Sequence, residues 1–183
     1  MKYLKLLFPI LFSHTIVFSQ DKSDPIEVTP AIEKKINEEI ITAVRSLKAK
    51  MTSDKESAAS IEFALDTFRI EKYEERYMDY DYSTAGMRSA TYDAAHKYDS
   101  LLNKYYKKLL AVLKETDKAA LVNAQKSWII FRGNELKLID TISKDEYSGG
   151  GTVQQLIDAS EYLDIIKQRT NTIYEHYMRT MQQ

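Results

Sequence analysis

The chain contains no cysteine. Disulfide bonds, thiol catalysis and thiolate metal ligands are therefore excluded, and stability must come from packing alone. Glycine and proline are also scarce, with five and three residues among 183. A chain so poor in both residues, and rich in Ala, Leu, Lys, Glu and Ile, favours long helices over a sheet-rich fold. Its length suits one domain with a sizeable core.

An excess of charge of either sign is missing as well. The 26 Lys and Arg residues nearly balance the 27 Asp and Glu residues, and the two signs are interspersed. A nucleic-acid-binding protein would show a basic patch or stripe, so this class is not expected. The thirteen tyrosines are an unusual load. We expect most of them to fill contacts between helices.

Catalytic signatures are also lacking. The sequence has no HExxH, GxSxG, P-loop or dinucleotide-binding motif. Beyond the N-terminal segment only His96 and His176 remain, on different predicted helices and with no carboxylate at an identifying spacing. We expect both histidines to be solvated, and the alternative is that they form a two-histidine metal site. We predict a non-enzymatic protein with no catalytic residue, metal or cofactor.

The first nineteen residues differ in character from the rest. Lys2 and Lys5 precede an apolar run over residues 6–18, and the small Ser19 follows. This order is typical of a secretory signal peptide, and the run is short for a membrane span. We expect cleavage near Ser19–Gln20, a mobile leader over 20–29 and a single helical domain over 30–183. The mature protein would be periplasmic or secreted, with no transmembrane segment.

The spacing of apolar residues predicts five helices. The first covers residues 30–51, and a loop over 144–152 precedes the last. Three consecutive glycines in that loop are incompatible with a helix interior. The expected N-caps are Thr29, Ser53 or Asp54, Ser83 or Thr84, Asp117 and Thr152. The predicted fold is all-α: an elongated antiparallel bundle of four to five helices with short connections.

One predicted helix carries polar residues on its apolar face. In "AQKSWIIFRGNE", residues 124–135, Gln125, Arg132 and Glu135 lie on the same side as Trp128 at about 100° per residue. Buried polar groups need partners. Glu135 is one turn from Arg132, and other predicted helices offer partners. We predict a structural polar network, with a ligand-facing cluster as the alternative; its members are Asp99, Gln125, Trp128, Arg132, Glu135 and Arg169.

Two segments are candidates for binding a partner. The stretch 71–83, "EKYEERYMDYDYS", combines carboxylates for steering with tyrosines for contact area. Its candidate residues are Glu71, Glu74, Glu75, Tyr77, Asp79, Tyr80, Asp81 and Tyr82. The loop 144–152 contributes Tyr147, Gly149 and Gly150, and its amides beside a helix N-terminus could bind an anion. The alternatives are a solvated helix end and a simple reversal of the chain.

Four stretches in order resemble a known family. They are "YDAAHKYDSLLNKYYKKLLAVL", "LVNAQKSWIIFRGNE", "GGGTVQQL" and "IIKQRTNTIYEH". Their order and spacing resemble the family named for the lysozyme inhibitor LprI, which are small exported helical proteins. The resemblance covers roughly residues 58–178, and the first helix, 30–51, lies outside it. Many relatives carry cysteines, whereas this chain has none, so a disulfide-stapled binding loop is not expected here.

The resemblance implies a periplasmic or surface protein that inhibits lysozyme by binding and occluding it. A second interpretation is an envelope interaction or scaffold protein that binds another exported protein or peptidoglycan. Inhibitory residues cannot be transferred from the resemblance, because the matching positions are those that build the bundle.

Overall fold

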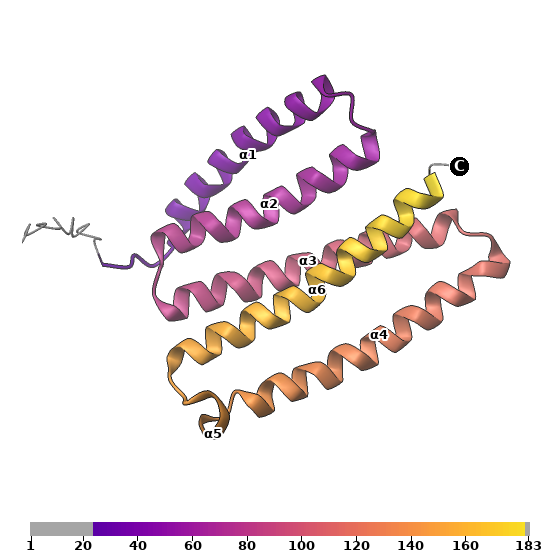
Figure 1. The fold of residues 1–183 in the computed structure, drawn as a ribbon. Coiled ribbons are helices and arrows are strands. Elements are labelled where there is room, and N and C mark those ends of the chain that lie inside the picture. Colours follow the sequence, from indigo (N-terminus) through magenta and orange to yellow (C-terminus); the bar gives the residue numbers. More distant parts are fainter. Residues whose placement is uncertain (1–23, 182–183) are drawn as a thin grey trace, which may run out of the picture.

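The computed structural model describes residues 24–181. Within this range the chain forms six helices and no strand (Figure 1); they are α1 (Pro30–Ser53), α2 (Ala58–Tyr80), α3 (Thr84–Val112), α4 (Glu115–Ile142), the short α5 (Asp145–Ser148) and α6 (Thr152–Met181). The predicted all-α helical bundle is confirmed. The predicted signal peptide and its cleavage site near Ser19 lie outside the described residues.

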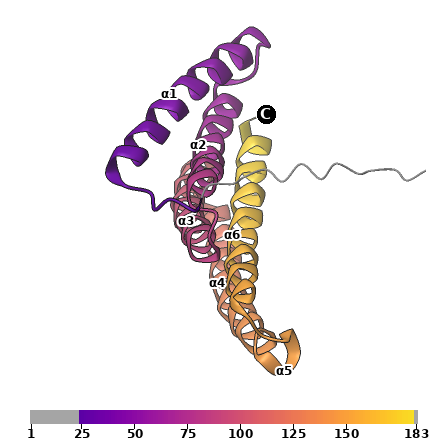
Figure 2. The ribbon, with the colours of Figure 1, turned by 90° about the vertical axis from the view of Figure 1, so that its left-hand side faces the viewer.

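The helices pack in the order α1, α2, α3, α6, α4. The α3–α6 pair has by far the most extensive contact and forms the middle of the molecule. Figure 2 shows α1 and α5 at opposite ends of the elongated arrangement. Each outer helix, α1 and α4, therefore packs mainly on one long neighbour.

Three of the long helices begin at capping side chains. Thr29 accepts a hydrogen bond from the backbone N–H of Ile32, as predicted, and Ser83 accepts one from Gly86. The second helix is capped by Ser57 and not by Ser53 or Asp54, so that prediction is wrong. The chain stays helical through Ser53 and reverses at Lys55, whose φ of 61° is left-handed. Ser57 is then the extended residue next to the new helix.

Two other predicted caps are also wrong. The fourth helix starts at Glu115 after Lys114, which makes no side-chain capping bond. Asp117 lies in the first turn of α4, where its negative charge favours the helix dipole instead. Thr152 is the first helical residue of α6 and not the residue before it. The loop 144–152 is partly helical, because it contains α5.

The main core lies between α3 and α6 and is rich in aromatic residues. Tyr98 and Tyr105 are almost completely buried. The Phe63 ring from α2 stacks on Tyr174 of α6 with ring centroids 3.7 Å apart, and Tyr105 meets both rings edge-on. Many of the tyrosines therefore fill contacts between helices, as expected. Burial raises the pKa of Tyr105, so its hydroxyl stays protonated.

A smaller core joins α1 to α2. Ile36, Ile40 and Val44 of α1 recur at four-residue steps and are buried against Leu65 of α2. This spacing places all three on one side of the helix. One apolar stripe therefore accounts for the position of α1.

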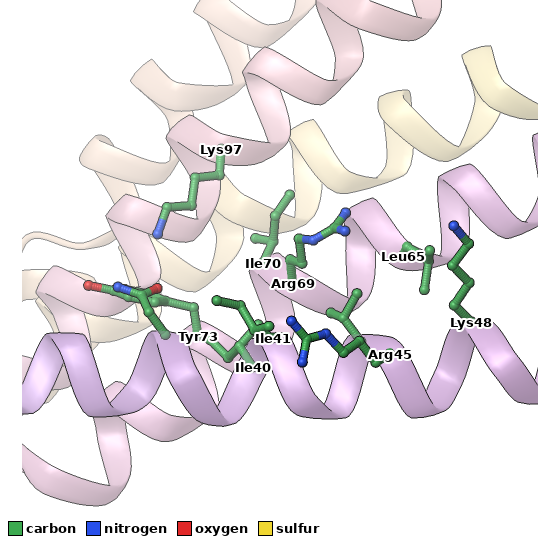
Figure 3. Close-up of a pocket in the computed structure, with 11 residues that line it drawn as sticks. Ile40, Ile41, Arg45, Lys48, Leu65, Arg69, Ile70, Tyr73 and Lys97 are labelled. Carbon is green, nitrogen blue, oxygen red and sulfur yellow. The ribbon is translucent and has the colours of Figure 1, made fainter.

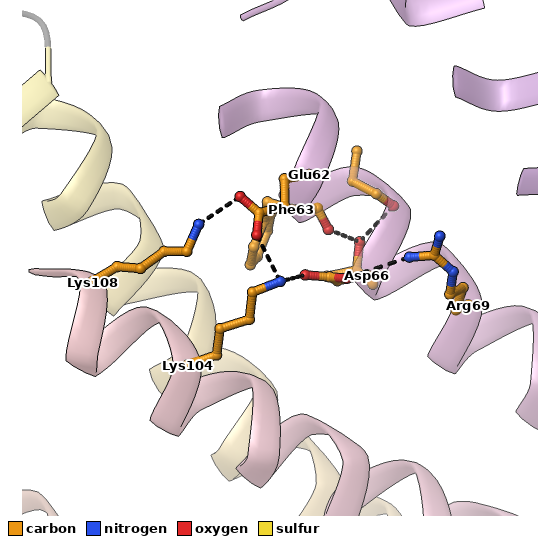
Figure 4. A network of polar contacts seen from close by, with 8 residues as sticks. Glu62, Phe63, Asp66, Arg69, Lys104 and Lys108 are labelled. Atoms are coloured by element: carbon orange, nitrogen blue, oxygen red, sulfur yellow. Dashed lines mark hydrogen bonds and ion pairs between the residues drawn. The ribbon is translucent and has the colours of Figure 1, made fainter. Parts of the chain in front are cut away.

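Ion pairs connect α2 to α3 (Figure 4). Glu62 accepts hydrogen bonds from Lys104 at 2.8 Å and Lys108 at 2.5 Å, and Lys104 also pairs with Asp66. These bonds from Lys104 and Lys108 hold the pKa of Glu62 below its ordinary value. The α1–α2 hairpin is thus attached to α3 by charged groups as well as by apolar packing.

Candidate functional site

The polar residues around Trp128 come together from three helices. Arg132 of α4 donates a 2.9 Å hydrogen bond to Asp99 of α3. Arg169 of α6 donates from Nε and Nη2 to Gln125 Oε1, at 3.1 and 3.0 Å. The Cζ atoms of Arg132 and Arg169 lie 4.9 and 5.9 Å from the centroid of the Trp128 ring, within the range of cation–π attraction. The structure therefore brings five of the six predicted network residues into one cluster.

Glu135 is the exception. No hydrogen bond or ion pair joins it to Arg132 or to another residue within the described part of the chain. The guanidinium of Arg132 is already engaged by Asp99 from the facing helix, so the pairing expected along α4 is not used. The two charged side chains, Arg132 and Asp99, are 26% and 38% exposed. The network is therefore half-buried, at the border between α4 and the core.

This position explains why α4 carries polar groups on its inward side. Only Leu121 and Ile139 of α4 are buried, and the contact between α4 and α6 is slight compared with that between α3 and α6. Polar contacts around Trp128 take the place of a continuous apolar stripe. That they fix the position of α4 remains a prediction.

The acidic segment 71–83 forms the end of α2 and the turn to α3. Its carboxylates have partners within the protein. Glu71 accepts from the Tyr98 hydroxyl and from Lys167, both at 2.5–2.8 Å. Glu75 pairs with Lys72, and Asp79 with Arg76. These pairs neutralise much of the negative charge that the sequence suggested for steering a basic partner.

The remaining residues of the segment also make internal contacts. Asp81 accepts hydrogen bonds from the backbone and hydroxyl of Ser83, and it packs so tightly on α3 that a Cβ at Gly86 would lie 2.1 Å from its Cγ. The Tyr80 carbonyl accepts from the Ile26 N–H, Tyr77 packs near Tyr73, and Tyr82 is partly buried. Burial raises the pKa of Glu74. The geometry thus favours a structural turn over an open binding surface.

The glycine-rich segment lies at one end of the molecule (Figure 1). The α5 turn ends at Gly149, and Gly149, Gly150 and Gly151 all have positive φ values of 75–99°. Only glycine adopts three such conformations in a row at little cost. Tyr147 is 66% exposed there. The three glycines therefore shape a protruding turn that presents a large aromatic side chain to solvent.

Sequence reasoning missed the apolar side chains exposed near this turn. They come from α4, α5 and the start of α6, and we call them the α5 tip: Leu138, Ile142, Tyr147, Val153 and Ile157. Phe131, about two helical turns before Leu138, is also exposed. Its spacing of seven residues to Leu138 marks a second apolar stripe beside the Trp128 face, and this signal was readable from the sequence.

His96 and His176 lie on different helices and in different environments. His96 is exposed on α3, whereas His176 on α6 contacts Arg179. Burial, followed by the charges of Arg179 and Arg169, lowers the pKa of His176. Among residues 24–181, no group of three or more metal-ligating side chains is close enough to hold an ion. No helix in that range is long and apolar enough to cross a membrane.

Comparison with known proteins gives a family. No curated protein and no solved structure matches the chain significantly. The family model described as lysozyme inhibitor LprI matches residues 76–173, from the end of α2 to the middle of α6. The matched range contains the polar network around Trp128 and the α5 tip, and it omits α1. Because the match covers more than half of the chain, the protein belongs to the LprI lysozyme inhibitor family.

Proposed function

We propose that the protein is exported, with signal cleavage near Ser19–Gln20, and that it binds a lysozyme and blocks its cleft without any catalytic activity of its own. Membership of the LprI family carries this proposal. Residues 30–183 act as one helical domain, in which α3, α4 and α6 hold the binding surface in place.

The α5 tip is the surface that fits this role best. Tyr147 and the surrounding apolar side chains are exposed at a narrow end of the molecule, and tyrosine is enriched among the few residues that supply most of the binding energy in protein interfaces. A protruding end can enter a concave cleft, whereas the flat sides of the helices cannot. The rigid helices α4 and α6 on either side limit the entropy lost on binding.

Charge on the tip favours a basic partner. Residues 138–157 contain Asp140, Asp145 and Glu146 against the single Lys144. Asp140 and Glu146 are exposed and form no ion pair within the described residues. In contrast to the paired carboxylates of 71–83, these groups are available to attract cationic side chains. Binding should then weaken as salt screens the charges.

The test is a cell-wall lysis assay with c-type, g-type and i-type lysozymes, with and without the purified exported protein. Stoichiometric inhibition of one type would support the proposal and identify the class of partner. Absence of inhibition at large molar excess over all three types would refute it for these enzymes. Co-sedimentation with peptidoglycan in the absence of lysozyme would instead favour the scaffold interpretation.

A matched pair of variants locates the binding surface. Tyr147 and Ile130 are both 66% exposed, but Ile130 lies on α4 away from the tip. We expect Tyr147→Ala to weaken inhibition by at least about tenfold, as removal of a central aromatic residue typically does, and Ile130→Ala to leave it unchanged. If both variants inhibit as well as the parent, the α5 tip is not the inhibitory surface. Residues 71–83 would then be the next candidate.

A further inference from the structure

A groove of about 620 Å³ lies between α1, α2 and the middle of α3 (Figure 3). This volume is typical of a site for a small organic ligand. The groove is lined largely by residues before position 76, so it belongs to the part of the chain that the family model does not match. It is also remote from the α5 tip, since α1 and α5 lie on opposite sides of the α3–α6 pair (Figure 1).

The floor of the groove is apolar. Ile40 and Val44 of α1 face Leu65 and Ile70 of α2, and all four are less than 9% exposed. Ile41 forms one edge and is 50% exposed. Such a surface favours contact with hydrocarbon over contact with water. A purely polar ion would gain little here.

The rim of the groove is cationic. Four basic side chains line it and no carboxylate does; they are Arg45, Lys48, Arg69 and Lys97. Figure 3 shows Arg45 and Lys48 on α1, Arg69 on the neighbouring α2 and Lys97 on α3. Arg69 pairs with Asp66 at 3.4 Å, and Lys97 with Asp93 at 2.5 Å.

Two of these cations have no internal partner. The side chains of Arg45 and Lys48 form no ion pair or hydrogen bond within residues 24–181, and both line the groove. The two residues lie three positions apart on α1, so their like charges repel one another, and an anion bound beside them would relieve this repulsion. The rim therefore favours a ligand with a negative headgroup.

The groove continues along α1 and α2. A second hollow of about 360 Å³ shares Lys48, Leu65 and Arg69 with it and extends it toward the turn between α1 and α2. Two carboxylates also line this second hollow, and both are paired with lysines of α3; they are Glu62 and Asp66. Along α1 the first hollow runs from Asn37 to Lys48, which is roughly 16 Å at the helical rise. An extended chain fits this shape better than a compact ring system.

From the apolar floor, the cationic rim and the elongated shape, we propose that the α1–α2 groove binds a single-chain amphiphilic anion, with its hydrocarbon chain on the floor and a carboxylate or phosphate headgroup between Arg45, Lys48 and Arg69. The protein would thus carry a lipid-type ligand at one side and its partner-binding tip at the other.

The test is calorimetric titration of the purified protein with dodecanoate and dodecyl phosphate below their micelle concentrations. We expect one molecule of either anion to bind per chain. Dodecyl maltoside, which has the same chain and a neutral headgroup, should bind at least about tenfold more weakly, and inorganic phosphate should not bind measurably. Equal binding of dodecyl maltoside, or tight binding of inorganic phosphate, would overturn the proposal, as would the absence of binding by both amphiphiles. Stronger binding of an acidic peptide than of the amphiphiles would identify a protein-binding groove instead.

Variants on one helix supply the control. The double variant Arg45→Gln with Lys48→Gln should weaken dodecanoate binding by about tenfold. The control, Lys34→Gln with Lys50→Gln, removes the same charge from α1 outside the groove and should change dodecanoate binding less than about twofold.

A third variant, Ile41→Glu, places a carboxylate at the edge of the groove and should abolish binding of both anions. Its helical content and melting temperature should stay near those of the parent, because Ile41 is half exposed. All three variants should still inhibit lysozyme if the tip is the inhibitory surface, so failure of one proposal is distinguishable from failure of the other.

Discussion

The two outer helices, α1 and α4, are held to the bundle in different ways. The inward side of α1 is a regular apolar stripe, Ile36, Ile40 and Val44, packed on α2. The inward side of α4 has only Leu121 and Ile139 buried, and between them lies the half-buried network of Arg132 and its partners around Trp128. Apolar packing is strong and tolerant of small shifts, whereas hydrogen bonds require one particular alignment.

We relate this difference in packing to the region that each helix supports. Helix α4 leads directly into α5, and directional contacts would hold the proposed binding tip in a fixed place. A helix that covers an apolar groove needs only a hydrophobic contact. The predictions below test this contrast, from the largest expected effect to the smallest.

Ile36→Ala should have the largest effect. Ile36 is fully buried between α1 and α2, and truncation of such a side chain costs about 2–5 kcal/mol, because apolar contacts are lost and a cavity remains. Chemical denaturation would measure the loss, and hydrogen exchange should show that α1 becomes the least protected helix. Ile41→Ala on the same helix, half exposed, should stay within about 0.5 kcal/mol of the parent. Similar losses in both variants would contradict the position of α1.

Arg132→Ala should have a smaller effect, about 1–2 kcal/mol. The variant loses a hydrogen-bonded ion pair and a contact with the Trp128 ring, but Asp99 is 38% exposed and can be solvated once its partner is gone. A fully buried pair would cost about 3–5 kcal/mol, which the exposure argues against. Trp128 fluorescence should shift to longer wavelength as the ring gains contact with water.

The coupling between Arg132 and Asp99 provides the control. A double-mutant cycle with Asp99→Ala should give a coupling energy of about 0.5–1 kcal/mol. Glu135→Ala should leave both stability and fluorescence unchanged, because Glu135 has no partner within the described residues. A large loss with Glu135→Ala would restore it to the network.

Glu62→Gln tests the attachment of the α1–α2 hairpin to α3. Hydrogen bonds from Lys104 and Lys108 lower the pKa of Glu62, so this carboxylate stabilises the fold above its unfolded pKa, and the stabilisation disappears as the pH falls through its folded pKa. The variant should therefore be less stable than the parent near neutral pH and equal to it in acid below both pKa values. Glu62 is 39% exposed, so solvent screening limits the loss to less than about 1 kcal/mol. Melting curves across this pH range would measure it.

Glu74→Gln should act in the opposite direction and give the smallest effect. Burial raises the pKa of Glu74, so the fold favours its protonated form, and stability decreases as the pH rises from the unfolded pKa through the folded one. The neutral variant should melt slightly above the parent near neutral pH and coincide with it in acid. A lower melting temperature at neutral pH would show that the charged form is stabilised by Thr91 or Lys167 instead.

The sequence predicted the fold class and several helix boundaries correctly. Thr29 before Pro30 marked the start of α1, and four-residue apolar spacing placed Ile36, Ile40 and Val44 on one side. Local signals failed where two capping residues competed. Asp54 and Ser57 are both good caps, and only the left-handed turn at Lys55 decides for Ser57.

The predicted site residues fared unevenly for a similar reason. The face of α4 was readable from its periodicity, so Gln125, Trp128 and Arg132 were grouped correctly. The choice between Glu135 and Asp99 as the partner of Arg132 depended on how α3 approaches α4, which no single segment encodes. Likewise, the carboxylates of 71–83 looked free in the sequence because partners such as Tyr98 and Lys167 come from helices distant along the chain.

The sequence by itself determined an all-α chain without disulfides, the faces of its long helices and its likeness to one family. These follow from local periodicity, capping and composition, which act over a few residues. Only the tertiary structure decided which carboxylates are paired, that Tyr147 protrudes at an end of the molecule, and that four cations from α1, α2 and α3 surround one apolar groove. Each of these depends on distances between helices, and those distances are set by the packing of the whole chain.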